Sequence, residues 1–217
     1  MRKLIEGFRQ FQRDYYSCHQ HLFQQLSRGQ RPLALFITCS DSRIDPCLLT
    51  GTEPGELFTI RNAGNLVPPY NALRGGEAAT IEYAVSVLKI REIIVCGHSH
   101  CGAMGGLLHP EQLEELPAVE EWLQHAKPRG RQVDAAWAQL EDEEARLDAA
   151  VRQNVLVQLA NLRTHPSVAA ALERGELALH GWVYQFECGQ VYAYDPQEGE
   201  FLSLEKASPI DPLPAGQ

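Results

Sequence analysis

Two short, uncharged runs of apolar residues constrain the fold of this chain more than any other feature. They are residues 33–38 (LALFIT) and 93–96 (IIVC). Both are continuously apolar, without the alternation of a strand that has one face in water, and they therefore predict strands buried on both faces. A helical pattern over residues 75–90, with Ile81, Val85 and Leu88 on one side, separates them. Strand, helix and strand in this order favour a parallel sheet in an α/β fold.

The other segments complete a single predicted domain over residues 1–217. Apolar residues three and four positions apart over residues 1–29 predict an N-terminal arm of amphipathic helices. We also expect a strand at 57–60, several helices over 117–172 with breaks at 128–130 and 165–166, and a hairpin over 177–194 at a sheet edge. The tail, residues 208–217, holds three prolines and is expected to be flexible. The predicted architecture is an α/β fold with a mainly parallel central sheet of about four strands, an added edge strand or hairpin, flanking helices and the helical arm.

Charge and hydropathy exclude several classes of partner. The formal net charge is −9, whereas binding to nucleic acid or to an anionic membrane requires clusters of Lys and Arg. The longest apolar runs are far shorter than the roughly 20 residues of a membrane-spanning helix. Glu6 and Arg9 interrupt any signal-peptide hydrophobic segment near the N-terminus. We expect a cytoplasmic protein that binds a small substrate or another protein, and neither nucleic acid nor membrane.

Six cysteines in a cytoplasmic chain indicate metal-binding, catalytic or buried thiols rather than disulfides. Cys39 directly follows the first buried strand, and His98 and Cys101 follow the second. Because ligands of open α/β sheets bind at the carboxyl ends of the strands, we expect these three side chains to meet there. Two thiolates and an imidazole suit zinc, and three protein ligands leave the fourth position of the metal open, as in catalytic sites.

A closed structural site with four protein ligands is the alternative, and Cys47, Cys96 or His100 could complete it. Cys96 lies inside its predicted strand and is expected to point into the core. Cys47 follows Pro46 at the start of a predicted helix, and His100 is a direct neighbour of Cys101 rather than a chelating partner. These positions favour the open site.

Asp41 and Arg43 occupy alternate positions just after Cys39 and can face the same side of an extended loop. A guanidinium beside a carboxylate keeps that carboxylate ionised. An ionised Asp41 could accept a hydrogen bond from water on the metal. The alternative is an ion pair that only stabilises the loop.

Four motifs in register resemble those of the beta-class carbonic anhydrases. They are residues 39–43 (CSDSR), 53–58 (EPGELF), 61–65 (RNAGN) and 97–102 (GHSHCG), and residues 179–184 (LHGWVY) are similar to a late strand of that family. The resemblance implies zinc-dependent, reversible hydration of carbon dioxide to bicarbonate and a proton. It implies one Zn²⁺ per chain, held by Cys39, His98 and Cys101, and a catalytic pair, Asp41 and Arg43. It also implies a substrate pocket lined by Gln30, Phe58, Ala63, Tyr83 and Gly102.

The resemblance gives further detail at three of these positions and at Phe36. Gln30 is implied to donate an amide hydrogen bond to a bicarbonate oxygen, and Ala63 stands where the family usually has a valine. Phe36 stands where bicarbonate-regulated members have a tryptophan, so the same inhibitory bicarbonate site is not expected. In some relatives the aspartate itself occupies the fourth zinc position, and Asp41 could do so here.

The resemblance also extends to assembly and location. Residues 1–29 resemble the arm that family members wrap around a partner subunit, which implies a homodimer or a larger assembly of dimers with pocket residues shared across the interface. The N-terminal segment and Pro68-Pro69-Tyr70 further resemble the carboxysomal members of cyanobacteria. This likeness makes carboxysome proteins candidate partners, with a role in carbon fixation and a cytoplasmic or carboxysomal location.

Two other functions fit the same motifs. Relatives on this fold hydrolyse carbon disulfide or carbonyl sulfide with the same metal ligands, and pocket width and access distinguish them. The second alternative is a weakly active zinc-binding scaffold, controlled by oxidation of Cys18, Cys47 or Cys188. The intact pair of Asp41 and Arg43, together with Gln30, favours the enzyme.

Overall fold

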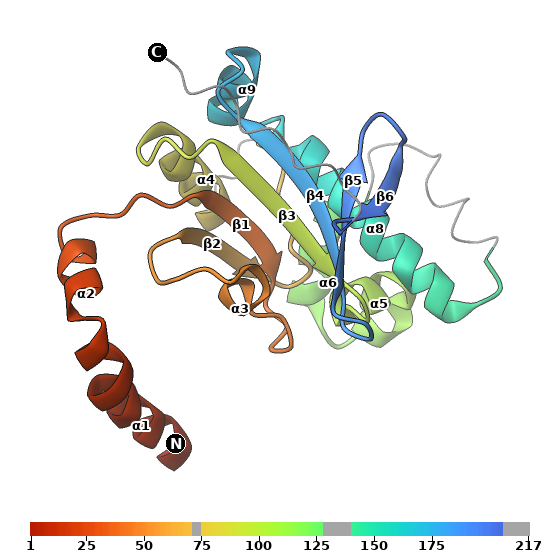
Figure 1. Ribbon diagram of the computed structural model, residues 1–217. Coiled ribbons are helices and arrows are strands. Elements are labelled where there is room, and N and C mark those ends of the chain that lie inside the picture. Colours follow the sequence, from red (N-terminus) through yellow and green to blue (C-terminus); the bar gives the residue numbers. More distant parts are fainter. Residues whose placement is uncertain (71–74, 128–139, 206–217) are drawn as a thin grey trace.

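A six-stranded sheet forms the body of the protein in the computed structural model, which describes residues 1–70, 75–127 and 140–205 (Figure 1). The strands are β1 Ala34–Cys39, β2 Leu57–Asn62, β3 Glu92–His98, β4 Ala178–Gln185, β5 Gln190–Asp195 and β6 Glu200–Ser203. Their order in the sheet is β2-β1-β3-β4-β5-β6. The first four strands in this order are parallel, and β5 and β6 continue the sheet in antiparallel fashion. The predicted α/β class, with its parallel sheet and edge hairpin, is confirmed.

The strand β6 was not predicted from the sequence. It follows a turn in which the Asp195 carboxylate accepts hydrogen bonds from the backbone N–H groups of Gln197, at 2.8 Å, and Glu198, at 3.3 Å. Gly199 completes the turn with a φ of +72°, a conformation that glycine adopts without steric cost. The Asp-Pro-x-x-Gly pattern was the available signal for this turn.

Helices lie around the sheet. The N-terminal arm consists of α1 Arg2–Gln10, the π-helical η1 Phe11–Tyr16 and α2 Gln20–Leu26. The other helices are α3 Pro46–Thr50, α4 Gly76–Ser86, α5 Gly102–Leu108, η2 Pro110–Leu113, α6 Pro117–Leu123, η3 Gln124–Ala126, α8 Glu143–Leu162 and α9 Pro166–Glu173. The helix predicted over residues 75–90 thus ends earlier, at Ser86. Segments 128–130 and 208–217, for which a break and a flexible tail were predicted, lie outside the described residues. No helix in the described part of the chain is long and apolar enough to cross a bilayer.

Successive residues of β1 enter two separate clusters of buried side chains. Leu35 and Ile37 belong to the larger cluster, which includes residues of α4, α5, α8 and α9. Phe36 belongs to the smaller cluster, together with Ile94 and Cys96 of β3. Because side chains alternate between the two faces of a sheet, this arrangement explains why the run around Phe36 is apolar at every position.

The long helix α8 lies directly against β3 and β4 (Figure 1). A Cβ atom at Gly97 would lie 3.0 Å from methyl carbons of Val151 and Val155, and one at Gly181 would lie 2.8 Å from Cγ1 of Val155. The distance at Gly181 is too short for a real carbon contact, and the distances at Gly97 are tighter than most such contacts. The two glycines therefore allow the close approach of α8 to the sheet.

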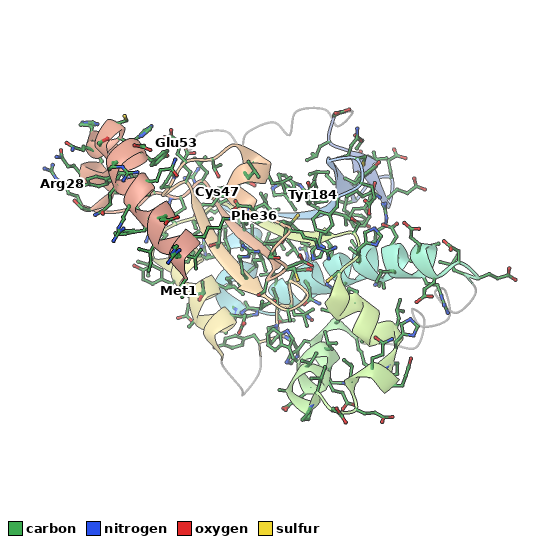
Figure 2. The ribbon with its side chains drawn as sticks, turned by 90° about the horizontal axis from the view of Figure 1, so that it is seen from below. Met1, Arg28, Phe36, Cys47, Glu53 and Tyr184 are labelled. Carbon is green, nitrogen blue, oxygen red and sulfur yellow. The ribbon has the colours of Figure 1, made fainter. Side chains whose placement is uncertain are left out.

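The N-terminal arm extends away from the body of the protein. Figures 1 and 2 show the segment from Met1 to Arg28 beside the sheet rather than over it. Its three helices contain no buried residue. Leu4 and Phe8 on α1 are 69% and 59% exposed. Such a row of uncovered apolar side chains is typical of a segment that packs against another subunit.

Candidate metal centre

Cys39, His98 and Cys101 meet where β1 and β3 end. Their ligand atoms lie within 4.8 Å of one another, and all three side chains are buried. The parallel pairing of β1 and β3 brings the ends of the two strands to the same edge of the sheet. A turn at Ser99 and His100, in which His100 has a φ of +52°, connects His98 to Cys101. The structure thus brings together the three predicted ligands.

The imidazole of His98 is oriented for metal binding. Its Nδ1 atom lies 2.8 Å from the carbonyl oxygen of Ser99. A carbonyl can only accept, so Nδ1 carries the proton and Nε2 carries the free lone pair. This Nε2 atom is buried and has no hydrogen-bond partner among the described residues. A metal-binding histidine usually donates its second ring N–H to an oxygen in this way.

The two thiols also fit a cation between them. Hydrogen bonds from the neighbouring Cys101 thiol and from the backbone N–H of Gly64 lower the pKa of Cys39 to about 4. The pKa of Cys101 is raised, because Cys39 lies beside it and because its thiol is buried. Two neighbouring thiolates repel each other, so both can lose their protons only when a positive charge lies between them. Two thiolates and one imidazole form a donor set that suits zinc.

The three candidates for a fourth protein ligand lie elsewhere. Cys96 belongs to the smaller buried cluster, and its thiol lies 3.4 Å from the carbonyl oxygen of Gly97. Cys47 is exposed on α3 (Figure 2). The ring of His100 pairs with the carboxylate of Glu187. None of them joins the candidate ligand group found within residues 1–70, 75–127 and 140–205, and this favours the open site with three ligands.

Asp41 and Arg43 form a bidentate ion pair beside the ligands. Nε of Arg43 donates to Oδ1 of Asp41 at 3.0 Å, and Nη2 donates to Oδ2 at 2.7 Å. The Arg43 guanidinium holds the pKa of Asp41 well below its usual range. Oδ2 of Asp41 lies 3.9 Å from Nε2 of His98. An ionised carboxylate therefore faces the ligand group.

Two further residues support this pair, and sequence reasoning missed both roles. Arg61 holds the loop after β1 through hydrogen bonds of 2.8–3.1 Å to three carbonyl oxygens, those of Cys39, Asp41 and Ile44. The ring of Phe186 lies 4.7 Å from the guanidinium carbon of Arg43. The motif at 61–65 could have pointed to Arg61. The position of Phe186 depends on the register of β4 against β3, which no local pattern reveals.

Two of the five predicted pocket residues lie next to the ligands. Ala63 precedes Gly64, whose backbone N–H donates to Sγ of Cys39 at 3.3 Å. Gly102 directly follows Cys101, and a Cβ atom there would meet no other atom within 4 Å. Both residues therefore border the metal centre.

The other three pocket residues lie elsewhere in the chain. The rings of Phe58 and Tyr83 stack with their centroids 6.1 Å apart, and Tyr83 is 46% exposed. Gln30 follows α2 and lines a groove between the arm and the loop at residues 53–56. Within one chain, the described contacts do not join these three side chains to the ligand group.

The comparisons with known proteins agree on one family. Residues 34–191 match the family model described as carbonic anhydrase. The chain is 52% identical to a carbonic anhydrase of Synechocystis sp., over 94% of this chain and 74% of that protein. It is 55% identical to a carbonic anhydrase of Pseudomonas aeruginosa, over 94% of this chain and 92% of that protein.

Solved structures of this family have the same fold. The beta-carbonic anhydrase CcaA superposes with a TM-score of 0.90 at 52% identity, over 94% of this chain and 91% of that one. One of two tetrameric beta-carbonic anhydrases from Sordaria macrospora superposes with a TM-score of 0.73 at 30% identity, over 88% of this chain and 92% of that one.

Proposed function

The chain belongs to the beta-class carbonic anhydrases and catalyses the reversible hydration of carbon dioxide, and from this premise we propose that Cys39, His98 and Cys101 hold one zinc ion. The observation that carries the proposal is the meeting of three buried ligand atoms within 4.8 Å of one another. The unpartnered Nε2 of His98 supports it. When bound, zinc supplies the Lewis acidity that lowers the pKa of water to about 7 and so makes hydroxide available near neutral pH.

Asp41 orients the oxygen that attacks carbon dioxide. Its carboxylate is ionised, so it can only accept hydrogen bonds, and two of them come from the Arg43 guanidinium. At 3.9 Å from Nε2 of His98, Oδ2 can also accept a hydrogen bond from a water or hydroxide beside the ligands. The lone pair of that oxygen then faces the substrate. Arg43 keeps the carboxylate ionised and fixed in place, because its Nε and Nη2 atoms each donate to one of the two Asp41 oxygens.

The substrate pocket is completed by a second chain. Ala63 and Gly102 border the ligands of their own chain, and Gln30, Phe58 and Tyr83 line the pocket from the partner subunit. The exposed ring of Tyr83 and the position of Gln30 beside the arm support this arrangement. Gln30 donates its amide N–H to an oxygen of bicarbonate. Because the pocket needs residues of two chains, the enzyme is active only as a homodimer or an assembly of dimers.

The location in the cell stays a prediction. The less specific prediction is a cytoplasmic enzyme. Packaging with carboxysome proteins is the more specific prediction, and it rests on the likeness of Pro68-Pro69-Tyr70 and the N-terminal segment to carboxysomal members of the family. Copurification of this chain with shell-enclosed particles from its own cells tests it, and recovery only in the soluble fraction would contradict it.

Carbon dioxide is favoured over carbon disulfide or carbonyl sulfide as the substrate. Relatives that are 52–55% identical to this chain over 204 aligned residues carry the name carbonic anhydrase. The paired and ionised Asp41 favours an active enzyme over a scaffold.

Metal analysis combined with stopped-flow kinetics tests the ligand assignment. Cys39→Ser and Cys101→Ser should each lose zinc and carbon dioxide hydration. Cys47→Ser is the matched control, because this exposed thiol lies outside the ligand group, and it should keep one zinc ion per chain and the wild-type rate. Full zinc content in Cys39→Ser would reject the assignment.

A further inference from the structure

The peptide unit between Ala63 and Gly64 accepts a hydrogen bond at one end and donates one at the other. Nε1 of Trp122, on α6, donates to the carbonyl oxygen of Ala63 at 2.8 Å. The N–H of Gly64, in the same peptide unit, donates to Sγ of Cys39 at 3.3 Å. One continuous line of hydrogen bonds therefore runs from an indole ring to the sulfur of a metal ligand.

We propose that Trp122 is a positioning residue of the metal centre, which acts through the Ala63–Gly64 peptide on the charge of the Cys39 sulfur. A hydrogen bond accepted by the carbonyl polarises the amide and strengthens its N–H as a donor. A stronger N–H donor withdraws more charge from the thiolate. Outer partners of this kind tune the donor strength of metal ligands. The inference rests on the proposed zinc ligation by Cys39.

The backbone of Gly64 fixes the direction of this N–H. Its φ is +80°, and a Cβ atom at this position would lie 3.1 Å from Cβ of Ala103 and 3.2 Å from Cε of Met104. A larger residue would therefore meet both side chains and would also need the left-handed conformation that glycine favours. The peptide is held in one orientation, in which its N–H meets the sulfur.

A second side chain holds the same segment from the other side. Nδ2 of Asn154, on α8, donates to the carbonyl oxygen of Gly64 at 2.9 Å. Asn154 is 1% exposed, and its own oxygen accepts a hydrogen bond of 2.8 Å from Nε2 of Gln158. The oxygen of Gln158 in turn accepts from the backbone N–H of Val67 at 2.8 Å. Two consecutive carbonyl groups are thus fixed by side chains from two different helices.

A packing role for Trp122 would not need its N–H. The ring packs against the larger buried cluster and lies at 79° to the ring of His125. Phenylalanine would keep much of this contact, but it has no N–H to donate to Ala63. The change Trp122→Phe therefore separates the hydrogen bond from the packing.

Cobalt substitution of the wild type and of Trp122→Phe tests the proposal. Sulfur that has lost a strong hydrogen bond holds its electrons less tightly, so the sulfur-to-cobalt charge-transfer band of Trp122→Phe should move to longer wavelength. Because the Ala63–Gly64 peptide and the Cys39 sulfur are also positioned less firmly, competition with a chelator should show a zinc affinity about 10-fold lower than that of the wild type. Circular dichroism establishes that each variant is folded.

The matched control is Trp182→Phe. Nε1 of Trp182 is buried but has no hydrogen-bond partner among the described residues, so this variant loses an indole N–H that makes no bond. Its band and zinc affinity should equal those of the wild type. A wild-type band position in Trp122→Phe, or the same shift in both variants, would overturn the proposal. Absence of any sulfur-to-cobalt band in the wild type would instead reject thiolate ligation, and the inference with it.

Discussion

Oδ2 of Asp41 lies 3.9 Å from Nε2 of His98. This separation is too long for a hydrogen bond, and the same oxygen accepts a bond of 2.7 Å from Nη2 of Arg43. The partner of the Asp41 carboxylate in the structure is therefore the Arg43 guanidinium, and this ion pair lies beside the three candidate metal ligands.

Replacing Asp41 with asparagine should slow catalysis without removing the metal. Asp41→Asn loses the negative charge that orients the attacking oxygen, so kcat for carbon dioxide hydration should fall about 100-fold. Stopped-flow measurement of the rate, combined with metal analysis, checks both parts. A rate within about twofold of the wild type would show that the ion pair only stabilises the loop.

The effect of this substitution should not depend on pH in the working range of the enzyme. The hydrogen bonds from Arg43 lower the pKa of Asp41 below its ordinary value of 3.8, so the carboxylate is ionised at every pH above that value. The ratio of wild-type to Asp41→Asn rates should then be constant between about pH 6.5 and pH 9. If the pKa of Asp41 were raised instead, the ratio would fall at the acidic end, and rates measured across this range distinguish the two cases.

Arg61 should be important for stability because it binds three carbonyl groups at once. Arg61→Lys keeps the charge but cannot reach all three, so the free energy of unfolding should fall by about 2 kcal/mol. Urea denaturation measures this loss. Arg174→Lys is the control, since Arg174 forms an exposed pair with Glu176, and its effect should stay within about 0.5 kcal/mol. Equal effects of the two substitutions would contradict the role given to Arg61.

A methyl group at Gly181 should disturb the contact between α8 and the sheet. In Gly181→Ala the new carbon would lie 2.8 Å from Cγ1 of Val155, whose side chain is stiff. We expect a loss of about 1–3 kcal/mol in the free energy of unfolding. Gly105→Ala on α5 meets no atom within 4 Å and should be neutral or stabilising by about 0.5–1 kcal/mol. Thermal unfolding compares the two, and an unchanged Gly181→Ala would show that α8 can move outward freely.

The apolar face of the arm should hold the subunits together. Leu4→Glu combined with Phe8→Glu places charges on two exposed apolar positions of α1, and the mass from light scattering should fall to that of a smaller species. Carbon dioxide hydration should fall with it, because the pocket needs two chains. Gln10→Glu adds a similar charge without removing an apolar side chain, and it should keep the wild-type mass. An unchanged mass in the double variant would show that this face is not the interface.

The parts of the site that could be predicted are those fixed by sheet topology. Cys39 follows a continuously apolar run, and His98 follows another, so two parallel strands alone bring them to one edge. The hairpin at β4 and β5 was predictable for a similar reason, since its pattern is local. The strand β6 was not predicted, because the Asp-Pro-x-x-Gly pattern at residues 195–199 was not interpreted as a turn between two strands.

The supports of the site could not be predicted, because they depend on contacts between distant segments. Asn154 and Gln158 are polar residues in a helix, and polar residues in helices usually face water. Here both are buried and satisfied by partners from residues 62–67, about 90 positions away in the sequence. The register of β4 against β3 likewise decides that Phe186 meets Arg43.

The close approach of α8 to the sheet has a consequence for metal binding. Val155, which lies against Gly97 and Gly181, is the neighbour of Asn154, which holds the carbonyl of Gly64. Any side chain larger than hydrogen at either glycine would push this part of the helix outward and draw the Asn154 amide away from its acceptor. The geometry around the Cys39 sulfur therefore depends in part on the absence of a side chain at Gly97 and at Gly181.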